Sequence, residues 1–400
     1  MSLRKKNPFL ALANSYFMDS PQPSTMSYWW NIGSLLGLCL VMQLATGMFL
    51  AMHYSSNLEL AFISVEHMMR DVSSGWAMRY AHANGASFFF MLMYAHMARG
   101  IYYGSYKSPR VAVWMMGVMM FLVLIITGFM GYVLPMGQMS LWGATVMTNL
   151  MSAMPYMGQD MVEFIWGGPS VGNPTLQRFF ALHYLLPFVL AALTLMHLMA
   201  LHEHGSSNPL GMTGNMDRLP FSPYFVFKDL MTVFVFLLVY SSFVFFNPNT
   251  LGHPDNYMPA NPMVTPASMV PEFYLLPFYA MLRAMPSKLG GVMAMVAAML
   301  MLMMLPMADR SIVRGNAFKM LSKMLYGLFM CNFLLLGALG SQHIEVPFMA
   351  LGQFATLFYF SYFMMLLPVV TMLENMLFYI GQQTERNGTE RNGSGVNNIN

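Results

Sequence analysis

Four histidines in two apolar stretches share one spacing. His82 and His96 lie fourteen residues apart in RYAHANGASFFFMLMYAHMARG, and His183 and His197 lie fourteen apart in ALHYLLPFVLAALTLMHLMALHEHG. Fourteen residues of α-helix turn to within about 40° of the starting direction and rise about 21 Å. Each stretch, as a helix, therefore presents two imidazoles on one face at two depths.

Imidazole binds metals and also exchanges protons near neutral pH. Two helices that cross a membrane in the same direction place His82 beside His183 at one level and His96 beside His197 at the other. No single metal ion bridges the roughly 21 Å between the levels, so the spacing predicts two stacked bis-histidine sites. Axial histidine ligation suits haem iron. A single membrane histidine is also compatible with hydrogen bonding inside a helix bundle.

Glycines repeat the fourteen-residue spacing in two further apolar stretches. A flat macrocycle between helices requires neighbours without side chains where its edge passes, so these glycines favour haem over a bare ion. Taken alone, glycine pairs also indicate close helix packing. The pairs are Gly33 with Gly47, and Gly117 with Gly131.

Charged and polar residues stand close to the histidines. Arg79 and Arg99 each lie three residues outward from a histidine, where each is a candidate partner of a haem propionate. His202 and His204 follow His197 at the end of the same stretch. His202 is a candidate for proton exchange with a substrate, and a solvated helix end is the alternative for both residues.

The composition is that of an integral membrane protein. Of the 400 residues, 57% are hydrophobic and 9% are charged, with mean hydropathy +0.51, whereas soluble domains contain about 25% charged residues. The formal net charge of +3 gives no indication of a nucleic-acid partner. Cys39 and Cys331 stand in apolar runs and predict neither a disulfide nor a CxxC site. The N-terminal residues do not read as a signal peptide.

Eight apolar stretches reach the length of about 20 residues that a spanning helix needs. We predict an all-α integral membrane protein with eight transmembrane helices, of which the first four form a di-haem four-helix bundle. Most of the 19 Lys and Arg residues fall on the side of the N-terminus, which places both termini inside, in the matrix or cytoplasm. The stretches are 31–53, 75–104, 111–135, 173–204, 222–246, 288–308, 320–340 and 348–380.

The chain divides into three regions. Residues 1–210 are expected to form the di-haem bundle, and residues 211–382 the last four helices. Residues 383–400 form a polar, low-complexity tail that we expect to be disordered. Two long connections, 136–172 and 247–287, lie on the outside, and connections of this length are often functional.

Many short motifs together resemble the cytochrome b family, the membrane subunits of respiratory ubiquinol–cytochrome c oxidoreductase (complex III). The resemblance covers residues 1–382 and is greatest to fungal mitochondrial forms. The motifs are DSPQPS, SYWWN, AMHYSS, RYAHANGASFFF, YYGSYKSPR, GQMSLWGATV, NPTLQRFFALHY, HGSSNPLG, FKDL, NPNTLGHPDNY, VPEFYLLPFYA and ADRSIVRGN.

The resemblance implies two b haems and an outer site of quinol oxidation. His82 and His183 would hold the low-potential haem near the outer face, and His96 and His197 the high-potential haem near the inner face. The outer pocket would be built from the GQMSLWGATV and PEFY segments. Its implied residues are Gly143, which lines it, Glu272, which carries a proton out, and Tyr279, which flanks the quinol ring. On sequence alone, Glu272 is equally compatible with a structural turn.

The resemblance also implies an inner pocket where quinone is reduced. Its implied residues are Asn31, His202, Lys228 and Asp229, with Ser20 nearby. A His–Lys–Asp group can supply protons as quinone gains electrons. Taken alone, Lys228 and Asp229 are also compatible with an interfacial ion pair.

The implied function is electron transfer from ubiquinol to ubiquinone through two b haems, coupled to proton translocation. The implied partners are a Rieske-type iron–sulfur protein, a c-type cytochrome and other complex III subunits, in a dimeric complex of the mitochondrial inner membrane. Two residues depart from the family pattern at the outer pocket. Phe273 stands where the family usually has Trp, and Met136 where it often has an aromatic residue.

Two other functions fit parts of the pattern. A transporter or channel would use the membrane histidines as proton relays, but it leaves the glycine spacing and the arginine placement unexplained. A simpler di-haem quinone reductase needs only the first four helices. The last four helices and the PEFY segment argue against that simpler enzyme.

Overall fold

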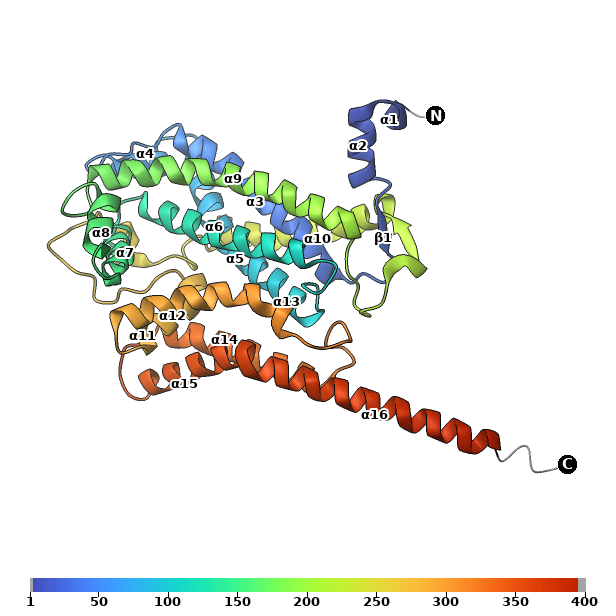
Figure 1. The fold of residues 1–400 in the computed structure, drawn as a ribbon. Helices are drawn as coiled ribbons and strands as arrows, with labels where there is room; N and C mark the ends of the chain where they lie inside the picture. Colours follow the sequence, from blue (N-terminus) through green and yellow to red (C-terminus); the bar gives the residue numbers. More distant parts are fainter. Residues whose placement is uncertain (1–2, 395–400) are drawn as a thin grey trace.

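The computed structural model describes residues 3–394 and is mostly helical (Figure 1). The first half contains α1 (Leu3–Lys6), α2 (Pro8–Phe17), β1 (Pro21–Pro23), η1 (Tyr28–Asn31), α3 (Ile32–Ala51), α4 (Ala61–Arg70), α5 (Gly75–Tyr102), α6 (Val111–Val133), α7 (Gln138–Asn149), η2 (Leu150–Ala153), α8 (Gly158–Trp166) and α9 (Asn173–His204).

The second half of the chain contains further long helices, which are joined by short helical turns. It contains η3 (Gly214–Met216), β2 (Arg218–Pro220), η4 (Phe221–Phe225), α10 (Val226–Phe246), η5 (Pro254–Tyr257), η6 (Phe273–Leu275), α11 (Leu276–Ala284), α12 (Lys288–Leu300), η7 (Met301–Met304), α13 (Leu305–Ala308), α14 (Met320–Gly340), α15 (Phe348–Ser361), η8 (Tyr362–Leu366) and α16 (Leu367–Ser394).

Seven helical runs among residues 3–394 are long and apolar enough to cross a membrane. They coincide with seven of the eight predicted spans. The other predicted span is present as α5, a helix of 28 residues that carries Arg79 and Arg99 and is less apolar than these seven. The seven runs are Tyr28–Ala51, Val111–Val133, Asn173–His204, Phe221–Phe246, Lys288–Ala308, Met320–Gly340 and Phe348–Thr384.

The long helices form two groups that lie side by side (Figure 1). In the first group, α3 packs along α5 and α6 packs along α9. In the second group, α11 packs against α12, α14 and α15. One buried apolar cluster joins the groups, and it includes Phe121 of α6, Phe278 of α11 and Tyr359 of α15. The N-terminal four-helix unit is therefore supported along one side by the C-terminal helices.

Local sequence signals explain the bounds of α9. Pro174 lies in its first turn, where the missing N–H costs no helical hydrogen bond. The helix ends before Gly205, whose φ of +70° lies in the left-handed region that favours glycine. Arg110 fixes this end, because its Nε donates to the Gly205 carbonyl at 2.7 Å.

A buried ion pair joins the two groups at the end of the bundle that carries α13. Lys107 Nζ lies 2.9 Å from a carboxylate oxygen of Asp309, whose side chain is 3% exposed. The hydroxyl of Tyr106 donates to the same carboxylate at 2.7 Å. The loop after α5 is thereby fixed to the loop that precedes α14.

Two features differ from the sequence predictions. β1 and β2 form a small antiparallel sheet, with Gln22 opposite Leu219, in a chain predicted to be all-α. Helix α16 continues to Ser394, so 383–394 is helical where we predicted disorder; residues 395–400 lie outside the described residues. Glu, Gln and Arg are good helix formers, which lets the polar sequence extend the preceding helix.

Candidate functional site

His82 of α5 and His183 of α9 face each other inside the four-helix unit. Their ring centroids are 6.2 Å apart and their planes are inclined at 84°. We call their position the outer level, after the side predicted for it, and the position of His96 and His197 the inner level. The structure thus brings together the two outer histidines, which lie about a hundred residues apart in sequence.

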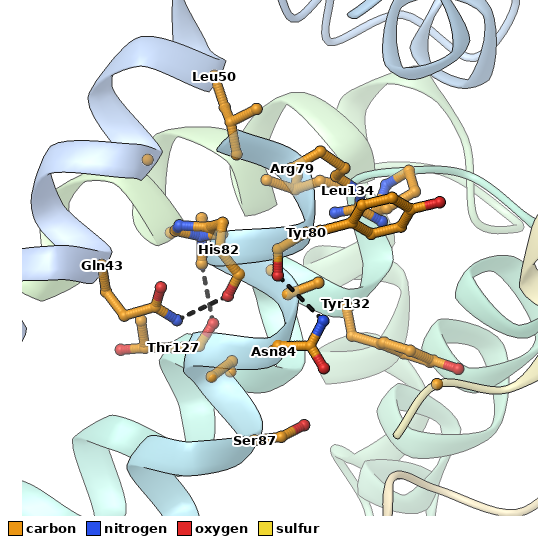
Figure 2. A pocket seen from close by; sticks show the side chains of 18 of the residues that line it. Gln43, Leu50, Arg79, Tyr80, His82, Asn84, Ser87, Thr127, Tyr132 and Leu134 are labelled. Carbon is orange, nitrogen blue, oxygen red and sulfur yellow. Dashed lines mark hydrogen bonds between the residues drawn. The ribbon is translucent and has the colours of Figure 1, made fainter. Parts of the chain in front are cut away.

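Each outer histidine forms a hydrogen bond through its ring Nδ1 atom. Figure 2 shows the pocket around His82, where Gln43 donates to the His82 backbone carbonyl. His183 Nδ1 lies 2.8 Å from the Thr127 carbonyl oxygen, which can only accept, so Nδ1 carries the proton. His82 Nδ1 lies 2.9 Å from Thr46 Oγ1. The ring of His183 therefore holds its lone pair on Nε2, and metal-bound histidines commonly have such an arrangement.

The four spaced glycines lie opposite the four histidines, one to one. The glycines of α3 face the histidines of α5, and those of α6 face the histidines of α9. A Cβ added at any of them would contact the Cε1 atom of its histidine, most closely at Gly131. The pairs are Gly47 with His82 (3.0 Å), Gly131 with His183, Gly117 with His197 (3.4 Å) and Gly33 with His96 (3.6 Å).

The inner level has different polar contacts. The Arg99 guanidinium donates through Nη2 to His96 Nδ1 at 3.1 Å and lies over the Trp30 ring, with Cζ 5.2 Å from its centroid. Arg99 Nε is buried and has no hydrogen-bond partner among the described residues. A buried cation with an unpaired N–H is suited to an anionic group. Because Nδ1 of His96 accepts from Arg99, the proton of the neutral ring lies on Nε2. Metal binding through Nε2 would therefore require the proton to move to Nδ1 and the Arg99 contact to break.

These residues fit a haem. At the outer level a cavity of about 280 Å³ is lined by both histidines, by Gly47 and Gly131, and by Arg79. The residues provide two nitrogen donors, glycines where a ring edge passes, and a cation for a carboxylate side chain. At the inner level the same residue types are present, with the guanidinium of Arg99 turned toward His96.

Glu272, a predicted outer-site residue, lines the same cavity as the outer histidines. Burial raises the pKa of its carboxyl to about 7, although a hydrogen bond with Tyr132 partly opposes this shift. A carboxyl with a pKa near 7 exchanges protons efficiently at neutral pH.

The other two predicted outer-site residues, Tyr279 and Gly143, are not among the residues that line this cavity. Tyr279 donates its hydroxyl to the Met269 carbonyl at 3.3 Å, and the Arg283 guanidinium lies 4.5 Å from its ring centroid. A Cβ on Gly143 would meet no atom within 4 Å.

The two departures from the family pattern take different positions. Phe273 begins η6 and packs edge-on against Tyr274. Met136 is buried and has a φ of +50°, and its carbonyl accepts the N–H of Ala260 at 3.0 Å. Met136 therefore holds the long loop before α11 against the start of α7.

The inner-site predictions are only partly brought together. Asn31 Nδ2 donates to the Lys228 carbonyl at 2.9 Å, which puts Asn31 beside Lys228 and Asp229. Lys228 donates to the Met26 carbonyl, and no ion pair joins it to Asp229 in the described part of the chain. The predicted His202 stacks on Tyr16 of α2 with ring centroids 4.0 Å apart. The predicted Ser20 accepts from Gln22 at 2.9 Å.

Comparison with known proteins decides the family. The family model "Cytochrome b/b6/petB" matches residues 17–205, and "Cytochrome b(C-terminal)/b6/petD" matches residues 259–360. Cytochrome b of Debaryomyces hansenii is 73% identical over 383 residues, which cover 96% of this chain and 100% of the relative. The chain belongs to the cytochrome b family. Membership implies b-type haem binding and a part in respiratory electron transfer.

Further relatives agree with this membership. Cytochrome b of Yarrowia lipolytica is 69% identical and that of Candida albicans 66%, with 95% and 96% of this chain covered and 99% of each relative. A solved structure described as a hyperthermophilic respiratory complex III contains a chain that is 32% identical. Its TM-score is 0.87, and the match covers 92% of this chain and 98% of that chain.

Sequence reasoning missed the side chains that support the outer histidines. Thr46 contacts the ring of His82, and Gln43 donates to its backbone carbonyl at 3.0 Å. Tyr132 lines the cavity with Glu272. A signal was present, because Thr46 precedes a spaced glycine in an otherwise apolar stretch, and polar residues at membrane depth indicate function.

Proposed function

We propose that the chain is the electron-transfer subunit of a ubiquinol–cytochrome c oxidoreductase that binds two b haems. Ubiquinol is oxidised at an outer site, ubiquinone is reduced at an inner site, and protons are released outside and taken up inside. Bound haem supplies reversible one-electron redox chemistry at two levels. The chain's own residues bind and orient the haems and move protons to and from the quinones.

The observation that carries this proposal is the one-to-one facing of four glycines and four histidines at two levels. His82 and His183 would ligate the outer haem, and His96 and His197 the inner haem. Arg79 and Arg99 would each bind a propionate. Helix packing alone requires small residues, but it does not require an imidazole opposite each glycine.

We extend the proposal to eight spans. The count of seven candidate spans leaves α5 out, yet α5 is long enough to cross and pairs along α3. The first residues of α1 and the far end of α16 lie at the same end of the bundle in Figure 1. An even number of crossings is needed for that, and α5 as the eighth span provides it. The four-helix unit of residues 1–210 and the helices of 211–382 would then act as the two functional regions.

At the outer site, Glu272 would accept a proton from quinol. Its carboxyl has a pKa near 7 because it is buried, and it shares the cavity with the outer histidines. Tyr279 and Gly143 would bound the quinol ring from α11 and α7. At the inner site, Asn31, Lys228 and Asp229 would bind quinone and supply protons, with His202 and Ser20 from the neighbouring segments.

The proposed partners follow from the family and from the chain's own composition. The likeness to a chain of a respiratory complex III supports assembly with other subunits of such a complex. With two cysteines in the sequence, the iron–sulfur and c-type centres would belong to a Rieske-type protein and a c-type cytochrome. A dimeric complex in the mitochondrial inner membrane, with both termini in the matrix, completes the proposal.

A redox titration of the purified complex, followed by reduced-minus-oxidised visible spectra, tests the proposal. Two b-type components with separate midpoint potentials are expected. An intact, folded preparation without b haem would overturn the electron-transfer function. It would leave the histidines as proton relays of a transporter or as packing residues.

A further inference from the structure

The ring of His82 is held by one side-chain hydroxyl. Thr46 Oγ1 lies 2.9 Å from His82 Nδ1, and it also lies 2.7 Å from the carbonyl oxygen of Met42, one helical turn earlier. A hydroxyl has a single proton and a carbonyl can only accept. The proton of Thr46 is therefore committed to Met42, and the contact with His82 is donated by the ring N–H.

This direction has a chemical consequence for His82. With the proton held on Nδ1, the lone pair of the neutral ring lies on Nε2, where a metal would bind. An oxygen that accepts from Nδ1–H draws the proton toward itself and makes Nε2 a stronger donor. A stronger nitrogen donor stabilises the oxidised iron more than the reduced iron and so lowers its reduction potential.

Among the described residues, no side-chain hydroxyl contacts a histidine of the inner level as Thr46 contacts His82. Both outer histidines donate Nδ1–H to an oxygen, through Thr46 and through the Thr127 carbonyl. At the inner level, His96 Nδ1 instead receives a hydrogen bond from the Arg99 guanidinium.

Resting on the two-haem function proposed above, we propose that Thr46 is a positioning residue for the outer haem. Its hydroxyl fixes the tautomer and orientation of His82 and lowers the midpoint potential of the outer haem. It acts through His82 and does not touch iron or quinone itself. The backbone carbonyl of Thr127 has the corresponding role for His183, but no side-chain substitution removes it.

The test is a redox titration of complexes that contain Thr46→Val or Thr46→Ser. Valine keeps the branched shape and removes the acceptor, so the outer component should shift to higher potential. Serine keeps the hydroxyl and should restore a midpoint close to the unsubstituted complex. The inner component serves as an internal control and should not move in either variant.

Thr194→Val is the matched control. Thr194 lies in α9 and donates to the Leu190 carbonyl at 2.8 Å, the same backbone contact that Thr46 makes. Its substitution removes that contact and leaves the histidine contacts unchanged, so both midpoints should stay in place. A shift in Thr194→Val equal to that in Thr46→Val would assign the effect to the helix rather than to His82.

The other possible results for the two Thr46 variants also test the role of Thr46. An unchanged or lower outer midpoint in Thr46→Val, at normal haem content, overturns the role of Thr46. Selective loss of the outer haem from Thr46→Val, with both haems kept in Thr46→Ser, supports it. Loss from both variants assigns the effect to side-chain volume and overturns it. Failure of the proposed function is distinct, because the unsubstituted complex would then lack two b components.

Discussion

His82 and His183 meet across the four-helix unit with 6.2 Å between ring centroids, although they belong to different helices and are separated by the whole of α6. Both histidines line one cavity between the helices. Their Nδ1 atoms are both engaged, at 2.9 and 2.8 Å. The pair is therefore oriented before any ligand binds, which lowers the cost of ordering a site.

Replacing one histidine at each level should remove one haem at a time. His82→Leu is expected to abolish the outer b component, and His96→Leu the inner one, because each leaves one imidazole at its level to hold the proposed haem. Visible spectra and haem content of the purified complexes provide the measurement. Loss of both components from either variant, with the complex still assembled, would contradict two independent levels.

The glycines should differ in their tolerance of alanine. Gly131→Ala places a Cβ against Cε1 of His183 more closely than any ordinary contact allows, whereas the nearest atom at Gly33 is 3.6 Å away. We expect Gly131→Ala to lower outer haem content severely and Gly33→Ala to be milder. Gly37→Ala is the control, because no atom lies within 4 Å of its Cβ position. Equal haem content in all three variants would argue against the facing arrangement.

The rate of quinol oxidation should depend on the ionisation of Glu272. Below about pH 7 the carboxyl is protonated and cannot accept a proton; above it, the carboxylate can. The rate is therefore expected to rise with pH through this region. Glu272→Gln should lower the rate about 100-fold and flatten the rise. A steady-state pH profile checks this, and an unaltered slope in the variant would place the proton acceptor elsewhere.

The ion pair between Lys107 and Asp309 should stabilise the complex. Asp309→Asn leaves the ammonium of Lys107, 12% exposed, without its partner, which costs about 3–5 kcal/mol when a buried pair is broken. Thermal unfolding of the purified complex measures the loss. The double variant Lys107→Met with Asp309→Leu should recover part of it, because the Lys107 charge is removed while the buried Lys319 still loses the Asp309 carboxylate. No recovery would indicate that packing at this position, rather than charge, sets the stability.

The spans were predictable because their signal lies within each stretch. Runs of apolar residues near 20 in length predicted all eight stretches; seven are candidate spans, and the stretch 75–104 is present as the helix α5, which carries Arg79 and Arg99. The prediction of disorder for the low-complexity tail differs from the structure over residues 383–394, which continue α16 to Ser394. A polar composition does not by itself prevent a helix from continuing.

The supporting contacts of the site were not predictable, because they depend on how distant helices pack. Which glycine meets which histidine follows from α3 packing on α5 and α6 packing on α9. Arg99 was predicted to be a partner of a haem propionate, whereas in the structure its guanidinium donates a hydrogen bond to His96. Nothing in the local sequence places Tyr132 beside Glu272, since the two belong to separate regions of the chain.

The facing of glycines and histidines gives the four-helix unit an approximate internal symmetry. Helices α3 and α5 carry two glycines and then two histidines, and α6 and α9 repeat that order at the same two levels. A twofold axis along the bundle therefore relates the two halves and passes through both sites. One such helical hairpin, paired with a copy of itself, would already contain four histidines that face four glycines at two levels.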